Sequence, residues 1–260
     1  MRSLGALLLG TVLLAQEPPR KPSAQPALAP AVCADSEIAE FGLECSAEDP
    51  CPVYLEIAGL ASAGGRLFAT GNFHTSTATL WSLLAVSDDD GKTWREPASR
   101  IRGAALDLIQ FSGTDTGWAA GHIAGELPRD PFFLRTSDNG DSWRRIPVFE
   151  DSSYGVVENF VFDSKSHGLL VINRRGARNQ RYQKMETQSG ADSWMLREVS
   201  PSAIALPRTR AADYRIRVDS AARLQRIERR TEKAWEPLSA FPVSGGACKP
   251  APRPEPPPQN

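Results

Sequence analysis

The 260-residue sequence predicts an all-β fold built from repeated units, and three observations support this prediction. Short apolar runs alternate with turns rich in Gly, Ser, Asp and Pro, and none of the runs has a clear helical period. One eight-residue turn sequence occurs twice. A tryptophan at the end of that turn recurs further along the chain, with spacings of 49, 51 and 41 residues between Trp94, Trp143, Trp194 and Trp235.

Both ends of the chain are predicted to lie outside the folded domain. Residues 1–16 contain Arg2 and then an apolar run, which is typical of a secretory signal peptide. Residues 17–32 form a Pro/Ala-rich linker and residues 249–260 a Pro-rich tail. The folded domain is therefore predicted to span residues 33–248 of a secreted or periplasmic protein without stable membrane insertion after signal cleavage.

The four cysteines predict disulfides, because a secreted chain meets an oxidising compartment. Three of them lie near the start of the domain, so if all four pair, Cys248 must join Cys33, Cys45 or Cys51. The sequence leaves the connectivity open, but every full pairing joins the two ends of the domain. Closing a loop of roughly 200 residues contributes about 5 kcal/mol in the chain-entropy model. The C-x2-C spacing typical of a zinc site is absent from the sequence.

The repeated turn reads Ser/Thr-x-Asp-x-Gly-x-Ser/Thr-Trp and follows an apolar run in both copies. A short Asp side chain accepts hydrogen bonds from the N–H groups of its own turn, Gly supplies a positive φ, and Trp begins the next strand. This turn physics explains every position, so a structural role is predicted rather than a catalytic or calcium-binding one. The motif resembles the Asp-box, or BNR repeat, of β-propellers. Its positions are Ser87, Asp89, Gly91, Thr93 and Trp94 in the first copy and Thr136, Asp138, Gly140, Ser142 and Trp143 in the second.

The tryptophan spacing suits a propeller blade of about 40–50 residues. Each unit is predicted to hold strands A, B and C, an Asp-box turn and strand D, in units of about 54–97, 98–149, 150–200 and 201–243. The third box has decayed to Thr187–Trp194, with Ser189 in place of Asp, and the fourth keeps only Trp235. Residues 221–235 are rich in Arg and Glu, so a helix is the alternative structure for this segment. The spacing of the repeated tryptophans favours a strand instead. Because isolated blades cannot bury both faces, we predict a β-propeller of about four four-stranded blades, with five blades or a partial ring as alternatives. The predicted joining of the chain ends agrees with ring closure.

Residues 115–148 resemble repeats of the photosystem II stability/assembly factor-like propellers. The resemblance is carried by Gly117–Gly121 and by the segment from Leu134 to Ile146, which contains the second box. It implies a secreted or lumenal binding scaffold rather than an enzyme. Such propellers have more blades than this chain can supply, so a half-propeller that works as an oligomer is an alternative. The photosystem role itself is not carried over.

Sialidases and related glycosidases also use Asp-boxes, and a divergent sialidase-like enzyme is the alternative from the enzyme class. Their chemistry needs an arginine triad, a Tyr nucleophile with a Glu partner, and an acid/base Asp. Here Arg145-Ile146-Pro147 follows a box rather than preceding the first one, so it does not match their Phe/Tyr-Arg-Ile-Pro segment. With no catalytic arrangement assigned, the sequence predicts a protein that is not an enzyme and that needs no cofactor or metal.

The loops between strands B and C are predicted to leave the blades on the face opposite the Asp-boxes, and loops on a rigid scaffold are where binding usually occurs. Alignment of the B strands places Asn72, His122 and Asn173 at equivalent positions, with His74 nearby. The Arg-rich loop 174–184 follows Asn173. It is either an ordinary solvated loop or a surface that recognises an acidic protein partner. Nucleic acid is not expected as a partner of a secreted protein. The predicted binding residues are Asn72, His74, His122, Arg174, Arg175, Arg178 and Arg181.

Charge is distributed unevenly along the chain although the net charge is only −1. Residues 33–170 hold 21 acidic and 10 basic side chains, whereas residues 171–240 hold 8 acidic and 15 basic ones. The alternatives are two solvated faces of opposite sign or a basic docking surface in the second half.

Overall fold

The computed structural model describes residues 28–175, 177, 179–207 and 213–251. The predicted signal peptide (1–16), most of the predicted linker (17–27), Arg178 and most of the predicted tail (252–260) lie outside the described residues. Within the described ranges, the chain contains no helix long and apolar enough to cross a membrane.

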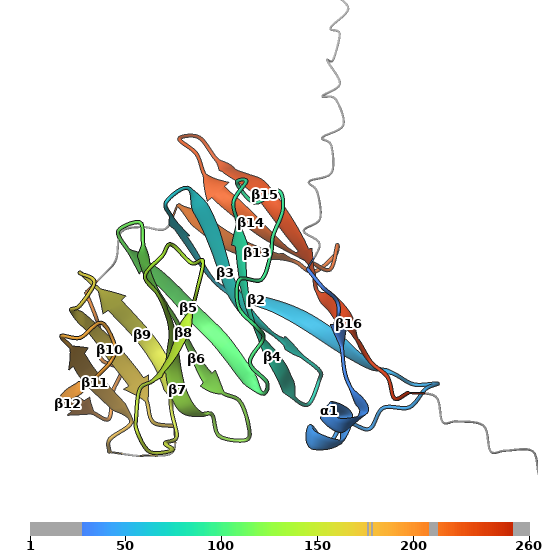
Figure 1. Cartoon of the computed structure of the whole chain (residues 1–260), viewed down its shortest axis with the longest axis horizontal. Coiled ribbons are helices and arrows are strands. Elements are labelled where there is room, and N and C mark those ends of the chain that lie inside the picture. The colour runs from blue at the N-terminus through green and yellow to red at the C-terminus, as the bar shows by residue number, and fades with distance from the viewer. Residues whose placement is uncertain (1–27, 176, 178, 208–212, 252–260) are drawn as a thin grey trace, which may run out of the picture.

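Four sheets, in which all but one of the strand pairs are antiparallel, make up the domain, and Figure 1 shows them arranged like the blades of a fan. The prediction of an all-β propeller with about four blades is confirmed. Blade one holds β2 (Cys51–Ala63), β3 (Arg66–His74) and β4 (Thr79–Ser87); blade two holds β5 (Ala104–Ser112), β6 (Thr116–Ile123), β7 (Arg129–Thr136) and β8 (Arg144–Pro147). Blade three holds β9 (Val156–Phe162), β10 (Gly168–Asn173), β11 (Tyr182–Thr187) and β12 (Met195–Ser200); blade four holds β13 (Tyr214–Asp219), β14 (Leu224–Arg230) and β15 (Trp235–Pro242).

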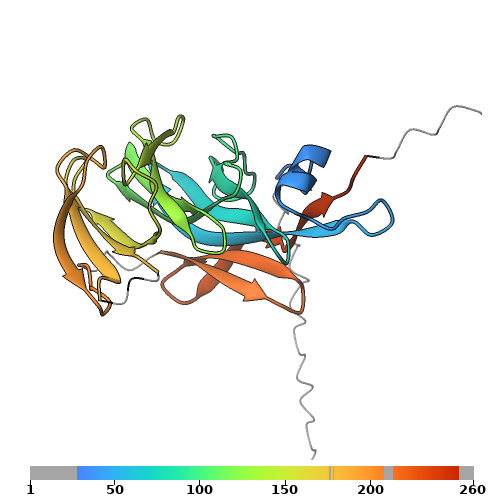
Figure 2. The ribbon, with the colours of Figure 1, turned by 90° about the horizontal axis from the view of Figure 1, so that it is seen from below.

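The blades form an open arc in the spatial order three, two, one, four (Figures 1 and 2). The inner strand β5 lies against blade one, β9 lies against blade two, and β13 of blade four lies beside β2. A cleft of about 720 Å³ occupies the inside of the arc. It is lined by the second halves of β2, β5 and β9 and by Asp213 and Tyr214. The inner strands of the first three blades therefore run in the same direction.

Blade four differs from the predicted four-stranded unit. Residues 201–207 form no strand, so the predicted first strand is missing from the described part of this blade. β13 begins beside the second half of β2. The turn after β13 lies near the start of β2, because the Val243 N–H donates to the Arg223 carbonyl of that turn and the Val243 carbonyl accepts from the Leu55 N–H. The blade thus begins with a strand that runs like the second strand of the other blades. Trp235 does not pack like the other box tryptophans, because it lies under the guanidinium of Arg215.

The chain ends meet beside blade one, where β16 (Ser244–Cys248) pairs with the start of β2, and β1 (Ala31–Val32) pairs with β16. A disulfide joins Cys33 to Cys248, and a second joins Cys45 to Cys51. The joined ends fasten blade four to blade one. They do not close a ring, because the arc is open between blades three and four (Figure 2).

Large aromatic side chains fill the space between neighbouring blades. Trp118 of blade two is fully buried, stacks on Phe162 of blade three with ring centroids 3.7 Å apart, and donates from Nε1 to the Gly190 carbonyl at 3.1 Å. Each box tryptophan packs against the preceding blade in space: Trp94 against Phe241, Trp143 against Phe68, and Trp194 against Phe133. The Asp-box turns are therefore fasteners between blades as well as turns within them.

Two glutamine side chains each bond the backbone of an inner strand in a neighbouring blade. Gln110 on β5 donates to the Phe162 carbonyl and accepts from the Phe162 N–H, both at 3.1 Å. Gln225 on β14 donates to the Leu55 carbonyl at 2.7 Å and accepts from the Ile57 N–H at 2.9 Å. These amides satisfy backbone groups of inner strands that lack a neighbouring strand on that side.

The first two Asp-box turns have the same hydrogen bonds. In the second, Asp138 accepts from the Ser142 N–H at 3.0 Å, from the Ser142 hydroxyl at 2.6 Å and from the Thr136 hydroxyl at 2.7 Å. Trp143 donates from Nε1 to the Gly140 carbonyl at 3.1 Å. These bonds, led by the Ser142 hydroxyl, lower the pKa of Asp138 to about 2, and Thr93 has the corresponding effect on Asp89.

The decayed third box keeps the same turn with different side chains. The Ser189 hydroxyl takes the place of the carboxylate, because it accepts from the Ser193 N–H at 2.9 Å and contacts the Ser193 hydroxyl at 3.1 Å. Ala191 stands where the other boxes have Gly and still adopts a φ of 85°. The backbone of this turn is set by its neighbours strongly enough to hold a non-glycine residue in the left-handed region.

Asp138→Ala is expected to reduce the loss of stability that the protein shows in acid. A carboxyl whose folded pKa lies near 2 and whose unfolded pKa lies near 3.9 stabilises the folded state above about pH 4, and that contribution is lost as pH falls towards 2. Urea unfolding of wild type and variant should differ most at pH 6 and least at pH 2. Asp151→Ala, on an exposed surface turn, is the control; an unchanged pH slope in the Asp138 variant would contradict the assignment.

Candidate binding face of the B–C loops

The loops between the second and third strands of blades one to three leave the arc on one face, which we call the loop face. Registers show that this is where the inner strands begin, since His74 pairs with Tyr54, Ile123 with Ala104, and Asn173 with Val156. The Asp-box turns follow the opposite ends of the third strands. The loop face is therefore separate from the boxes.

Each of these three blades holds a carboxylate on its inner strand against a polar residue at the end of its second strand. Asn72 donates to Glu56 at 3.1 Å, His122 Nδ1 lies 2.9 Å from Asp107 Oδ2, and Asn173 donates to Glu158 at 2.9 Å. Asn72 and Asn173 are buried, while Glu56 and Glu158 are exposed. The sequence alignment of strands found the second-strand residues but missed all three carboxylates.

A local signal could have revealed two of these carboxylates. Asp107 and Glu158 each interrupt an apolar inner strand, and each is the extra residue of a β-bulge in the pairing with the second strand. Bulges turn a side chain away from the regular alternation and are common next to functional sites. An acidic residue inside an apolar run is the corresponding sequence signature.

Two of the cavities on the loop face are lined by members of these polar pairs. The one between blades two and three, about 330 Å³, is lined by Asp107, His122, Glu158 and Arg175 together with apolar residues. The other, about 580 Å³, lies at blade one; Glu56, Asn72 and His74 line it, so His74 is separated from the His122 cavity. In the described part of the chain, no group of three or more His, Cys, Asp or Glu side chains is placed to hold a metal ion.

The Arg-rich loop stands at the edge of the first of these cavities. Arg174 and Arg181 are joined through their backbones at 2.7 Å, with the Arg174 guanidinium over the Phe149 ring. Arg181 donates to the side chain of Asn173 at 3.4 Å, while Arg175 is exposed and lines the cavity. The structure thus places Arg175 of the basic loop and His122, both predicted binding residues, at one cavity, together with the carboxylates of Asp107 and Glu158 that were not predicted.

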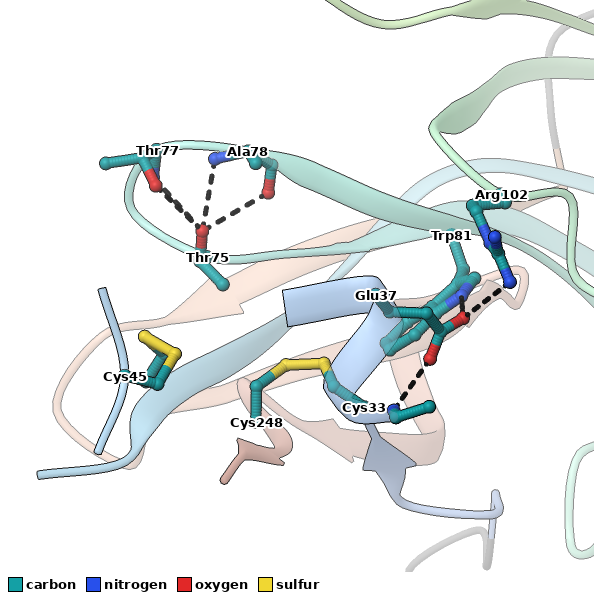
Figure 3. The surroundings of a disulfide bond; sticks show 11 residues. Cys33, Glu37, Cys45, Thr75, Thr77, Ala78, Trp81, Arg102 and Cys248 are labelled. Carbon is teal, nitrogen blue, oxygen red and sulfur yellow. Dashed lines mark hydrogen bonds and ion pairs between the residues drawn. A yellow bond between two sulfur atoms is a disulfide. The ribbon is translucent and has the colours of Figure 1, made fainter. Parts of the chain in front are cut away.

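The helix α1 (Asp35–Glu40) and the β3–β4 loop form the wall of the blade-one cavity (Figure 3). Glu37 accepts from Trp81 Nε1 at 3.3 Å and pairs with Arg102 at 3.3 Å, which fixes the helix to β4. The Thr75 hydroxyl accepts from the N–H groups of Thr77 and Ala78 at 3.2 and 3.1 Å. This wall is therefore held by side-chain hydrogen bonds, an ion pair and the nearby disulfides rather than by regular sheet.

The fold and the loop face define the chain as an open β-propeller. No protein-family model matches the chain, and the search of curated proteins likewise finds no match. Among solved structures, it is similar to YCF48 bound to a D1 peptide, with 18% identity, a TM-score of 0.40, and coverage of 72% of this chain and 53% of that one.

Other similar structures are enzymes. An α-L-arabinanase of Penicillium chrysogenum complexed with arabinobiose has 12% identity and a TM-score of 0.38, over 75% of this chain and 62% of that one. A putative 6-phosphogluconolactonase of Bacteroides uniformis has 13% identity and a TM-score of 0.34, over 74% and 56%. The chain thus spans just over half the length of these propellers.

These neighbours correct one prediction made from the sequence. The chain was expected not to be an enzyme, but the solved propellers that it resembles include an arabinanase and a putative lactonase, so that expectation is wrong as an inference from the fold. The sequence lacks the Phe/Tyr-Arg-Ile-Pro segment that precedes the first box of sialidases, but this says nothing about other enzyme chemistries. We do not retain the prediction.

Proposed function

We propose that the protein is a secreted or periplasmic scaffold that binds a protein partner through its loop face. The observation that supports this most directly is the juxtaposition of Arg175 with Asp107, His122 and Glu158 in one cavity between two rigid blades. A surface that offers guanidinium donors beside ordered carboxylates and an imidazole suits a charged polypeptide segment. The preferred partner is a protein with an acidic surface.

The basic loop supplies the donors for such a partner. Arg174 and Arg181 are held in place by contacts with Phe149 and Asn173, so little side-chain freedom is lost when a carboxylate binds. The paired carboxylates below the loop repel a second acidic group. They would therefore favour a segment in which acidic and basic or amide side chains alternate.

The compartment is part of the proposal. Residues 1–16 would serve as a cleaved signal peptide, residues 17–32 as a linker and residues 249–260 as a tail around the folded domain 33–248. Two disulfides without a free cysteine among the described residues agree with an oxidising compartment. N-terminal sequencing of the mature protein from fractionated cells would test both the cleavage and the location.

The variant Arg174→Glu/Arg175→Glu/Arg181→Glu is expected to bind its partner at least about tenfold more weakly, because attraction to an acidic surface becomes repulsion. The partner would first be captured by crosslinking in the cell envelope and then titrated against purified variants. Arg144→Glu/Lys165→Glu/Arg217→Glu is the matched control, with three exposed basic residues away from the loop face. Equal affinities of the two triple variants would contradict the proposal.

Hydrolysis of an aryl glycoside is the outcome that would replace the scaffold with an enzyme. Asp107 and Glu158 are the residues to change in that test, because they are carboxylates in one cavity. Turnover by the wild type that is lost in both Asp107→Asn and Glu158→Gln would place chemistry at the loop face. Turnover that survives both changes would place it elsewhere.

A further inference from the structure

We infer that the outer edge of β12 is a dimerisation site, at which a second copy of this chain adds its own β12 antiparallel around a two-fold axis. This inference is independent of the proposed partner binding, because β12 is the outermost strand of blade three and does not line the loop-face cavities.

The edge is open and carries an unusual amount of exposed apolar surface. Met195, Leu196 and Val199 are 57%, 50% and 42% exposed on a strand of six residues. Within the described residues, no strand pairs with the outer edge of β12. An exposed apolar edge with free backbone N–H and C=O groups is a template for pairing with another strand.

The other outermost strands are protected against such pairing. β8 ends in Pro147 and has Arg144 and Arg145 side by side, and β15 contains Pro237 and ends in Pro242. Proline has no N–H to donate, and two copies of an Arg-Arg edge would repel each other. The outer edge of β4 is already used, since Ser82 N–H donates to the Ile101 carbonyl and Val86 bridges Arg95. Of these edges, β12 is the one that has no proline, no pair of adjacent like charges and no segment already paired to it among the described residues.

The residues of β12 complement themselves under a two-fold axis. The sequence Met195-Leu196-Arg197-Glu198-Val199-Ser200, paired antiparallel with itself, sets Leu196 opposite Val199 of the partner subunit. Arg197 is the extra residue of a bulge against β11, which leaves Leu196 and Val199 on one face of the sheet. The two apolar pairs therefore meet on the same face of the joined sheets, as a closed isologous contact requires.

The charges agree with this arrangement. Arg197 is bonded to Glu186 at 2.6 Å, and Glu198 is bonded to Lys184 at 2.6 Å. Across the axis, Arg197 comes within reach of Glu198 of the partner subunit. The result is a row of alternating sign that runs from Lys184 through both copies of β12, which favours this pairing over one with an unrelated edge. Because a single strand edge buries less area than a stable dimer needs, we expect a weak dimer that depends on concentration.

Sedimentation of the purified full chain over a concentration series tests the inference. The wild type should move from monomer towards dimer as concentration rises to about 0.5 mM, a range suited to a dissociation constant of tens to hundreds of micromolar. Leu196→Lys should raise that dissociation constant at least tenfold. Val32→Lys, at an apolar residue of β1 that is 73% exposed and lies outside β12, should leave it unchanged.

Charge reversal in a mixture keeps the test independent of general damage. Arg197→Glu alone and Glu198→Arg alone should each sediment as monomers, because like charges then meet across the axis. An equimolar mixture of the two variants should form heterodimers, because opposite charges meet again. A wild type that stays monomeric throughout, a Leu196→Lys variant that dimerises normally, or a mixture that remains monomeric would overturn the inference.

Discussion

Trp118→Ala is expected to lower the free energy of unfolding by about 3–5 kcal/mol, the usual range for truncating a large buried aromatic residue. Trp118 is fully buried where blade two meets blade three, and it stacks on Phe162. The alanine variant would leave a cavity between two sheets that cannot easily move together. It would also leave the Gly190 carbonyl of the third box without its donor. Chemical unfolding followed by circular dichroism measures the loss.

Trp235→Ala is the matched control for this prediction. Trp235 is half-buried and lies under Arg215 on the side of blade four that faces away from blade one, so its truncation removes surface contact rather than core. A loss of about 1 kcal/mol is expected there, in keeping with a partly exposed cation–π contact. If the two tryptophan variants were equally stable, the junction between blades two and three would not be a core.

Removal of the Cys33–Cys248 disulfide is expected to cost more stability than removal of Cys45–Cys51. The first joins residues 215 apart in sequence and the second residues 6 apart. The chain-entropy model assigns about 5 kcal/mol to the long loop and about 2 kcal/mol to the short one. Cys33→Ser/Cys248→Ser and Cys45→Ser/Cys51→Ser, unfolded in urea without reductant, provide the comparison, and the short loop serves as the control for loss of a disulfide as such.

The opposite order of stabilities would show that the long disulfide does not constrain the unfolded chain. A small effect of both double variants would point to an unfolded state already held compact by other contacts. Either result would weaken the view that blade four is kept in place by the joined ends.

The Asp-box turns show why the fold could be predicted from the sequence. Asp138, Gly140 and Trp143 act within eight residues of one another, so their hydrogen bonds follow from local spacing alone. The same argument predicted the strands of blades two and three and the first three strands of blade one, whose predicted fourth strand is reduced to a single bridge between Val86 and Arg95. It also placed Asn72, His122 and Asn173 correctly at equivalent strand ends.

What the sequence could not supply depends on contacts between distant segments. The first strand was predicted for blade four because the tryptophan period extends to Trp235, yet that tryptophan lies under Arg215 and no such strand forms in residues 201–207. The third box looked decayed because Ser189 and Ala191 replace Asp and Gly, although the fold holds its turn. Asp107 and Glu158 of the loop face were missed because bulges, which depend on strand pairing, turn these two carboxylates towards their partners.

The open arc also determines how stability is shared among the blades. In a closed ring every blade has two neighbours, but among the described residues the strands of blade three pack chiefly against blade two, and those of blade four against blade one and the joined ends. The protein therefore behaves as a short linear array, in which each interface adds to the stability of only the two units it joins. Local unfolding can start at blade three without disturbing blades one and four. The blade that carries the Arg-rich loop is therefore also the blade expected to unfold first.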